Sequence, residues 1–393
     1  RGGILEKTRQ RVKDRLPGFD VNKLILTATH THSAPVSIEG VYELPKDGVM
    51  RPAEYFEFLL GRLTEVIVKA WQSRAPGLVG WGLGHAVVAQ NRRALYADGR
   101  AEMYGKTDRP DFRGIEGYED HAVQVLLFWD KNKKLLATAV DVACPAQEVE
   151  GNLAVSADYW GEVRKLLRAR HGEGLTVLGW IGAAGDQSPH LMFRKAAEER
   201  MRQLRGLTRL EEIARRIDHG WQEAFEEAVK EQHADVPLTH KVQTVQLPRR
   251  TVTDKEYAQA KEQIERFSKD PRQRTLVGWH GHVIEQYERQ KAGRDEPYPT
   301  EVHAIRLGDV AIATNSFELF TDYGIQIQAQ SPALQTFVIQ LAGEGTYLPS
   351  ERAVGGGGYS AIPQSNRVGP EGGQVLVDRT VELIDSMWKR SKG

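Results

Sequence analysis

The stretch LTATHTHSAP, residues 26–35, is the most informative part of the sequence for both the fold and the site. It overlaps an apolar run, Leu24 to Leu26, so we expect a buried strand over Val21–Thr29. His30 and His32 stand two residues apart, and on a strand this spacing projects both imidazoles to the same side. Imidazole suits zinc binding or acid–base chemistry near neutral pH. The alternative interpretation is a polar strand end with two solvated histidines.

The composition narrows the class of function. The chain has 393 residues with 53 basic and 53 acidic side chains, so its formal charge is zero. This balance does not favour a nucleic-acid or anionic-membrane partner. The sequence contains no apolar run long enough to span a bilayer. Its single cysteine, Cys144, excludes an internal disulfide framework.

The start of the chain raises an expectation about its origin. The sequence begins with Arg1 and a helical pattern over residues 4–16, with no leader before it. Because a helix opens an α/β pattern, we expect that a preceding strand is missing and that the chain is processed or truncated. Localisation stays open, with a secreted or periplasmic protein as our expectation, and the oligomeric state is open as well.

Apolar runs alternate with amphipathic helical stretches along the chain, which predicts an α/β fold with a mixed sheet flanked by helices. We expect a single domain over residues 1–393. The expected strands lie at 21–29, 78–88, 122–129, 135–143, 175–181, 301–307, 310–314 and 336–341, and the expected helices at 4–16, 52–71, 156–170, from about 317, and 374–389. Acids and bases alternate in 191–230 and 254–292, which predicts charged helical insertions solvated around the core.

Polar groups follow several of these strands, and active sites of α/β folds gather at such strand ends. Arg92 belongs to an Asn-Arg pair that is also typical of a solvated turn. Cys144 follows the 135–143 strand and is a metal thiolate, a nucleophile or a small buried hydrophobe. In GDQSPH (185–190), backbone N–H groups could stabilise an oxyanion, and the His190 imidazole could approach the Ser188 hydroxyl.

Further candidates lie near the end of the chain. Glu318 stands at an expected strand-to-helix transition, where a carboxylate is also favoured by the helix dipole alone. Tyr347 and Tyr359 flank the glycine run Gly355–Gly358, which can close over a ligand or merely bend the chain.

Taken in order, these motifs resemble those of the neutral/alkaline non-lysosomal ceramidase family. The ordered set is THTHSAP (29–35), NR (91–92), SADYWGE (156–162), GDQSPH (185–190), FE (317–318) and two tyrosines twelve residues apart, 347 and 359. The resemblance runs from about residue 20 to the final helix, and it implies an α/β catalytic domain with one catalytic zinc. It implies zinc ligands at His30, Glu318 and Tyr347, and groups lining the reacting centre at His32, Arg92, Ser188 and Tyr359.

The sequence also departs from the family pattern. The family's second zinc histidine lies fourteen residues before the Asp of its S-x-D segment, and here that position is Cys144. A thiolate is a competent zinc ligand. Otherwise Gln147 or Glu148 takes the role, or metal binding is weakened or lost. His190 replaces the family's Asn and joins the candidate catalytic residues. We expect the chain to lack the sandwich domain of typical members, and no strongly apolar segment indicates a groove for a ceramide tail.

The resemblance therefore implies a zinc-dependent hydrolase of an amide (N-acyl) bond. Zinc with an open coordination position lowers the pKa of bound water to about 7 and polarises a carbonyl. Arg92 or Tyr359 would then stabilise the tetrahedral oxyanion, while Ser188 is a nucleophile or a hydrogen-bond partner. The substrate would be a small molecule such as a lipid amide.

Two alternatives stay open. The first is a carbohydrate-active enzyme, a uronate-polysaccharide lyase or glycoside-processing enzyme, which would use the acid–base set of His32, His190, Tyr347, Tyr359 and Arg92. The second is a catalytically dead binding module, because replacement at a metal position is the usual first step to that outcome.

Overall fold

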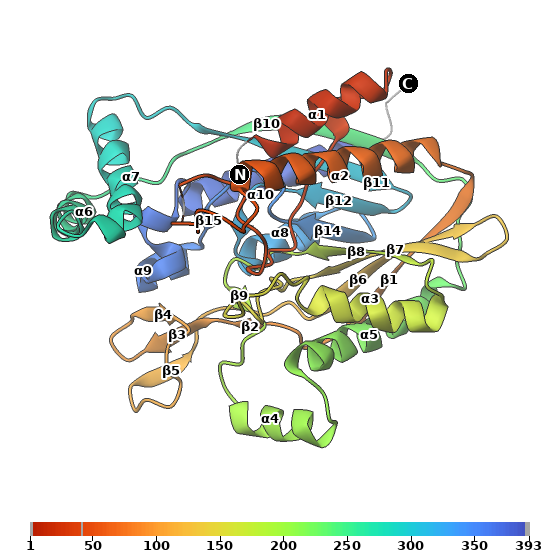
Figure 1. Ribbon diagram of the computed structural model, residues 1–393, viewed down its shortest axis with the longest axis horizontal. Helices are drawn as coiled ribbons and strands as arrows, with labels where there is room; N and C mark the ends of the chain where they lie inside the picture. Colours follow the sequence, from red (N-terminus) through yellow and green to blue (C-terminus); the bar gives the residue numbers. More distant parts are fainter. Residues whose placement is uncertain (1–2, 41, 390–393) are drawn as a thin grey trace.

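The structure, a computed structural model, describes residues 3–40 and 42–389, so Arg1 lies outside the described residues. Two four-stranded sheets form its centre (Figure 1). The first sheet has the order β1 (Gly77–His85), β6 (Ala122–Asp130), β7 (Leu135–Val142) and β8 (Thr176–Ile181). The second has the order β10 (Leu238–Leu247), β11 (Tyr298–Leu307), β12 (Val310–Thr314) and β14 (Gln335–Ile339).

Both sheets are mixed. In each sheet three strands pair antiparallel and the edge strand pairs parallel with its neighbour, β8 with β7 and β14 with β12. Short strands surround these sheets near the site. They are β2 (Gln90–Asn91) paired with β9 (Gln187–Ser188), β13 (Glu318–Leu319) paired with β15 (Tyr347–Leu348), and β3 (Arg93–Tyr96) between β4 (Ala101–Met103) and β5 (Phe112–Ile115).

The helices and 3-10 turns complete the element order. The α-helices are α1 (Ile4–Arg15), α2 (Pro52–Gln72), α3 (Tyr159–His171), α4 (Lys195–Leu204), α5 (Arg209–Ala228), α6 (Asp254–Phe267), α7 (Arg274–Lys291), α8 (Thr321–Gln330), α9 (Glu351–Gly356) and α10 (Pro370–Trp388). The 3-10 turns are Val21–Lys23, Pro271–Gln273, Tyr359–Ala361 and Pro363–Ser365. Among the described residues, none of these helices is both long and apolar enough to cross a membrane.

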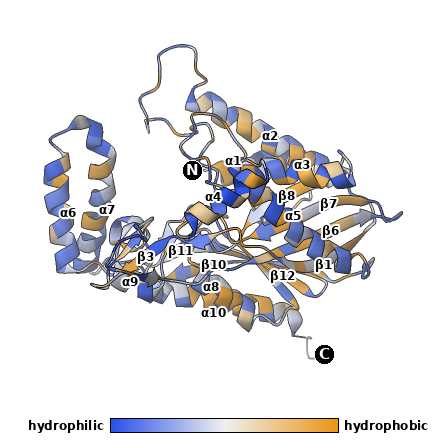
Figure 2. Cartoon of the chain, turned by 90° about the horizontal axis from the view of Figure 1, so that it is seen from below, coloured by the Kyte–Doolittle hydropathy of each residue, from blue (hydrophilic) through white to orange (hydrophobic). Residues whose placement is uncertain are grey.

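The two sheets pack face to face, and helices cover their outer faces. One apolar cluster joins Leu126 of the first sheet to Ile312 and Phe337 of the second. A second cluster lies between the first sheet and the helices α3 and α5, and a third between the second sheet and the helices α8 and α10. Figure 2 shows α8 and α10 along one side of the strands and α3 on the other. The predicted mixed α/β fold flanked by helices is confirmed, with two sheets rather than one.

Within the first charged stretch α5 belongs to the core, so the prediction of a solvated helix was wrong for α5, whereas α4 buries none of its residues and agrees with it. Within 191–230, α5 buries Ile213, Ile217 and Trp221 at helical spacing against the first sheet. The glycines of β1 permit this close packing, because a Cβ at Gly84 would collide with the carbonyl group of Gly220 on α5. Glu223, Glu226 and Glu227 of the same helix are exposed, whereas Glu212 and Asp218 are buried and paired with arginines.

The second charged stretch forms a helical hairpin, α6 and α7, that stands at one end of the molecule in both views (Figures 1 and 2). It has a small core of its own, with Ala260 and Val283 buried and the rings of Tyr257 and Tyr287 stacked 4.1 Å apart. The prediction of a solvated helical insertion is confirmed for this stretch.

Candidate active site

The histidine segment is an irregular loop, so the predicted strand over Val21–Thr29 was wrong. Asp20 accepts a hydrogen bond from the Asn22 N–H and caps a 3-10 turn over Val21–Lys23, which prevents an extended start. The segment after it is held by separate bonds, such as the Ala146 N–H to the Thr29 carbonyl at 3.1 Å. A short apolar run without a neighbouring strand therefore does not form a ladder.

The two histidines still meet, although no strand pleat aligns them. His30 has a φ of 61°, in the left-handed region, which interrupts the alternation of side chains. Its ring centroid lies 5.0 Å from that of His32 at an angle of 40°. The loop itself, anchored to residues 146 and 156, therefore sets their position.

Glu318 and Tyr347 are brought together by strand pairing. β13 and β15 pair parallel with Glu318 directly opposite Tyr347. The helix expected from about Phe317 begins only at Thr321, so Glu318 is not part of its first turn. The Glu318 carboxylate lies 3.8 Å from His30 Nε2, and the two side chains are 14% and 17% exposed. Segments almost three hundred residues apart thus place an imidazole, a carboxylate and a phenol at one point.

Arg92 supplies a buried cation beside these groups. It is 2% exposed, and its Nη2 donates to the Gly185 carbonyl at 2.9 Å and to the Tyr347 hydroxyl at 3.2 Å. Burial lowers the pKa of Arg92, but the neighbouring Tyr347, Tyr104 and Glu318 outweigh it, and the net pKa is raised. Arg92 therefore stays charged at any working pH.

The Tyr347 hydroxyl is a neutral hydrogen-bonding group next to this cation. Burial raises its pKa above the ordinary value of 10, and the negative charge of Glu318 adds to the effect against the opposing charge of Arg92. The Tyr359 ring lies 5.6 Å from Tyr347 and is 45% exposed. Its pKa is raised for the same first reason, burial. Tyr359 thus lies at the solvent-facing side of the cluster.

Tyr104 connects Arg92 to Ser188, and sequence reasoning missed it. Its hydroxyl accepts from Arg92 Nη1 at 3.3 Å and from Gln147 Nε2 at 2.5 Å, and it donates to Ser188 Oγ at 3.1 Å. Tyr104 has a φ of 54° and follows the β3–β4 hairpin, where its N–H bonds the Arg92 carbonyl at 2.7 Å. No sequence signal announces this, because the position depends on the fold of the hairpin.

Ser188 and His190 do not form the hydroxyl–imidazole pair that the sequence suggested. Ser188 is fully buried in β9, and its Oγ accepts from the backbone N–H of His190 at 3.1 Å. The imidazole instead turns toward Glu148, with Nε2 3.3 Å from that residue's carbonyl oxygen. Ser188 therefore acts as a hydrogen-bond partner in this arrangement, and an activating base does not accompany it.

Glu150 contacts both His32 and His190, and it is a second residue whose place in the site the sequence analysis did not predict. Its Oε2 lies 2.9 Å from His32 Nδ1, and its Oε1 lies 3.8 Å from His190 Nδ1. The carboxylate therefore links two candidate catalytic imidazoles that come from different loops.

Cys144 lies in the hydrophobic core between the first sheet and α3. It is fully buried with Tyr159 and Trp160, and its thiol contacts the Pro145 carbonyl at 3.6 Å. Burial raises the pKa of this thiol well above its ordinary value, which disfavours the thiolate that a metal needs.

The residues that do converge fit a metal site with three protein donors. Among residues 3–40 and 42–389, no group of three or more His, Cys, Asp or Glu side chains is placed to hold an ion, so Cys144 does not complete a set with His30 and Glu318. His30, Glu318 and Tyr347 offer one nitrogen and two oxygen donors, which is the number that a catalytic zinc takes from a protein when one position stays open.

A cleft of about 400 Å³ opens beside the cluster. Glu318, Tyr347 and Tyr359 line it on the side of the site, and α7 lines it through Trp279, His282 and Arg289 among others. The insertion therefore forms part of the entrance to the candidate site.

Comparisons with known proteins identify the fold type. No family model matches the chain. The curated neutral ceramidase of Pseudomonas aeruginosa is 30% identical over 132 residues, which are 33% of this chain and 18% of that protein. The crystal structure of neutral ceramidase from Pseudomonas aeruginosa superposes with a TM-score of 0.65 at 18% identity, covering 98% of this chain and 64% of that chain. A ceramidase complexed with C2 gives a TM-score of 0.63 at 18% identity and covers 98% and 66%.

These comparisons show that the chain has a ceramidase-like fold along nearly its whole length. The chain spans about two thirds of the solved ceramidase chains that it matches.

Proposed function

We propose that the protein hydrolyses an amide (N-acyl) bond at the cluster of His30, Glu318, Tyr347 and Arg92. The observation that carries the proposal is the convergence of these four groups, two of which (Glu318 and Tyr347) line one cleft, on a ceramidase-like fold. Water adds across the C–N bond, so the acyl group leaves as a carboxylic acid and the nitrogen as an amine.

The residues of the chain have distinct parts in this reaction. Arg92 is held by the Gly185 carbonyl and the Tyr347 hydroxyl, so its charge is fixed before substrate arrives. Such a preorganised cation stabilises the negative charge that develops on the carbonyl oxygen. The neutral Tyr359 hydroxyl offers a hydrogen bond to the same oxygen or to the departing nitrogen.

His30, Glu318 and Tyr347 would hold zinc. When bound, zinc supplies a polarised carbonyl and a water of lowered pKa. The His30 and Glu318 side chains are mostly enclosed, which limits competing solvent at that point. The secreted or periplasmic location and the single-domain organisation stay predictions.

A second candidate is the carbohydrate-active enzyme, and one observation favours it. Glu150 links His32 and His190 into an acid–base pair that the metal cluster does not use. Such a pair could move protons in elimination at a uronate. Release of a free amine and an acid from N-acyl amides supports hydrolysis, whereas ultraviolet-absorbing unsaturated products from a uronic-acid polymer support elimination.

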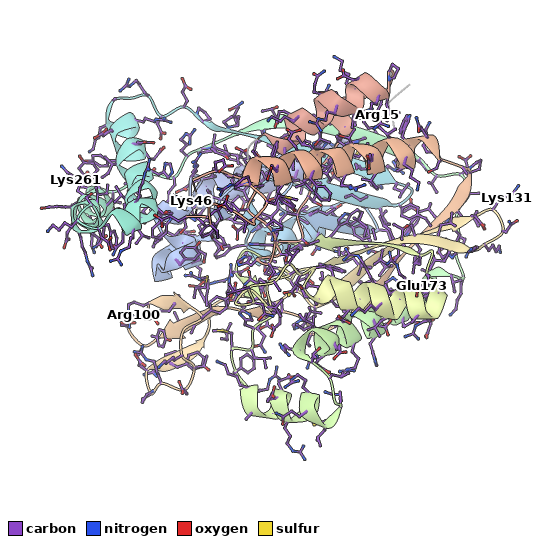
Figure 3. The ribbon with its side chains drawn as sticks, viewed as in Figure 1. Arg15, Lys46, Arg100, Lys131, Glu173 and Lys261 are labelled. Carbon is purple, nitrogen blue, oxygen red and sulfur yellow. The ribbon has the colours of Figure 1, made fainter. Side chains whose placement is uncertain are left out.

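The test of the first proposal uses two variants with matched controls. We expect His30→Ala and Glu318→Gln to lose the bound metal and to lower amide hydrolysis by about a hundredfold or more. The control variants His219→Ala and Glu173→Gln change exposed residues and should keep both the metal and the activity; Figure 3 shows Glu173 at the opposite end of the molecule from Lys261 of the α6–α7 hairpin. Full activity in either His30→Ala or Glu318→Gln contradicts the proposal. If instead the wild-type chain contains no metal and binds a ligand without converting it, the protein is a binding module.

A further inference from the structure

The α6–α7 hairpin holds its cleft-facing side in a defined position. Gln290 Oε1 accepts from the Val252 N–H at 3.0 Å, and its Nε2 donates to the Val252 carbonyl at 3.1 Å. On the body of the protein, Gln364 Nε2 lies 3.1 Å from His280 Nδ1 of α7. Lys261 of α6 is at the outer edge of the hairpin in Figure 3, so α6 faces away from the site. The hairpin therefore contributes one fixed wall, α7, to the cleft.

Three arginines without an acidic partner line this cleft. They are Arg249, Arg289 and Arg367. Within the described part of the chain, none of their guanidinium groups has a carboxylate oxygen within 4.0 Å. The adjacent Arg250 shows the contrast, because its guanidinium is paired with Glu256 at 3.1 Å.

Hydrogen bonds hold the side chain of Arg249 and the backbone of Arg367 in place without neutralising either guanidinium group. Arg249 Nε donates to the backbone carbonyl of Glu296 at 2.7 Å, and the Arg367 N–H donates to Thr346 Oγ1 at 3.1 Å. The acidic residues that line the cleft are Glu318, which belongs to the reacting cluster, and Glu285, which lies 3.8 Å from His282. The wall outside the cluster is therefore a positively charged surface.

Aromatic side chains line the same cleft as the arginines and the reacting groups. The rings of Trp279 and Tyr359 are 5.9 Å apart, and Tyr359 in turn contacts Tyr347. All three line the same cleft. The cleft therefore offers aromatic faces as well as arginines, and such faces suit a carbon chain or the apolar face of a ring.

We propose that the substrate carries an oxyanion group, a carboxylate or a sulfur oxyanion, that binds Arg249, Arg289 and Arg367 while the scissile amide lies at Glu318 and Tyr347. The inference rests on the proposed amide hydrolysis and adds the substrate class. Guanidinium groups bind such oxyanions through paired, charge-assisted hydrogen bonds. One such group is expected to improve kcat/KM by about tenfold to a hundredfold over an uncharged analogue.

The test uses three aminomethylcoumarin amides of matched length, pentanoyl, glutaryl and sulfobutanoyl, which differ in the end of the acyl chain. We expect the glutaryl or sulfobutanoyl amide to exceed the pentanoyl amide at least tenfold in kcat/KM, by the charge-assisted bonds above. The better of the two acids tells carboxylate from sulfonate recognition. In the double variant Arg289→Gln/Arg367→Gln the acid-to-pentanoyl ratio falls toward one, and in Arg274→Gln, an exposed arginine of α7 outside the cleft, the ratio is kept.

A binding measurement separates this inference from the proposed function. Calorimetry compares glutaramate, which keeps the terminal carboxylate, with pentanamide, which lacks it, on the wild-type chain and on the double variant. If no amide is cleaved but glutaramate binds more tightly and requires Arg289 and Arg367, the hydrolase proposal fails and the inference stands. If the amides are cleaved with equal kcat/KM and an unchanged ratio in the double variant, the inference is overturned and the hydrolase stands. Absence of both cleavage and selective binding overturns both.

Discussion

Replacing Cys144 by alanine separates a packing role from a metal-binding role at the position where the resemblance to ceramidases implies a histidine. The thiol is fully buried among Tyr159 and Trp160. Losing one buried heavy atom costs about 1 kcal/mol of transfer free energy, and the small cavity adds about 0.5 kcal/mol. We therefore expect the free energy of unfolding to fall by about 1 to 2 kcal/mol, with metal content and activity unchanged.

The assay is urea unfolding followed by fluorescence, together with metal analysis of the folded protein. For an m-value of about 3 kcal/mol/M, the expected loss shifts the midpoint by about 0.3 to 0.7 M urea. Cys144→Val is the matched variant, because an apolar side chain of similar volume restores packing but cannot bind a metal. If both variants fold normally yet lose one metal ion and the activity, Cys144 is a ligand and the reasoning from burial is refuted.

Three further predictions concern the same framework. Tyr104→Phe removes the hydroxyl shared by three side chains, so we expect stability to fall by about 1 to 3 kcal/mol in urea unfolding and kcat to fall, and an unchanged kcat would contradict its place in the network. Gly185→Ala pushes a Cβ against the Glu318 carbonyl, so we expect a loss of about 1 to 3 kcal/mol and of bound metal, and wild-type values of both would argue against this close approach. Burial, with the neighbouring His303, lowers the pKa of His240 from 6.5 to about 4, so between these pH values the unfolded chain binds a proton at His240 that the native state does not bind. The midpoint of urea unfolding should therefore fall as the pH drops from 6.5 toward 4, and a midpoint that does not change over this range would contradict the prediction.

The long apolar or amphipathic runs could be predicted from the sequence. The helix expected over 52–71 is α2 (Pro52–Gln72), and the strand expected over 122–129 is β6 (Ala122–Asp130). In both segments the pattern of apolar residues extends over enough residues to distinguish a helix from a strand. The sequence analysis missed β10 (Leu238–Leu247), because only two of its residues, Val245 and Leu247 near its end, are buried. Its extended conformation depends on its pairing with β11.

The candidate site was predictable as a set of residues but not as an arrangement. The ordered motifs identified His30, Glu318 and Tyr347, and the structure brings these three together. Glu150 and Tyr104 carry no local signal, because their roles arise from contacts between loops that the sequence separates. Cys144 illustrates the opposite error, since the spacing that aligned it with a ligand says nothing of the apolar neighbours that surround it.

The site also lies across the seam between the two sheets. The Gly185 N–H donates to the Leu319 carbonyl at 2.7 Å, and the Gln340 N–H donates to the Ile181 carbonyl at 3.1 Å, so backbone hydrogen bonds cross between the two halves there. His30 and Arg92 come from segments associated with the first half, and Glu318 with Tyr347 from the second. A small separation of the halves would disassemble the chemistry while leaving each sheet intact. Activity is therefore a more sensitive gauge of damage to this protein than its secondary structure, and inactivation by heat or denaturant should precede the loss of its circular dichroism signal.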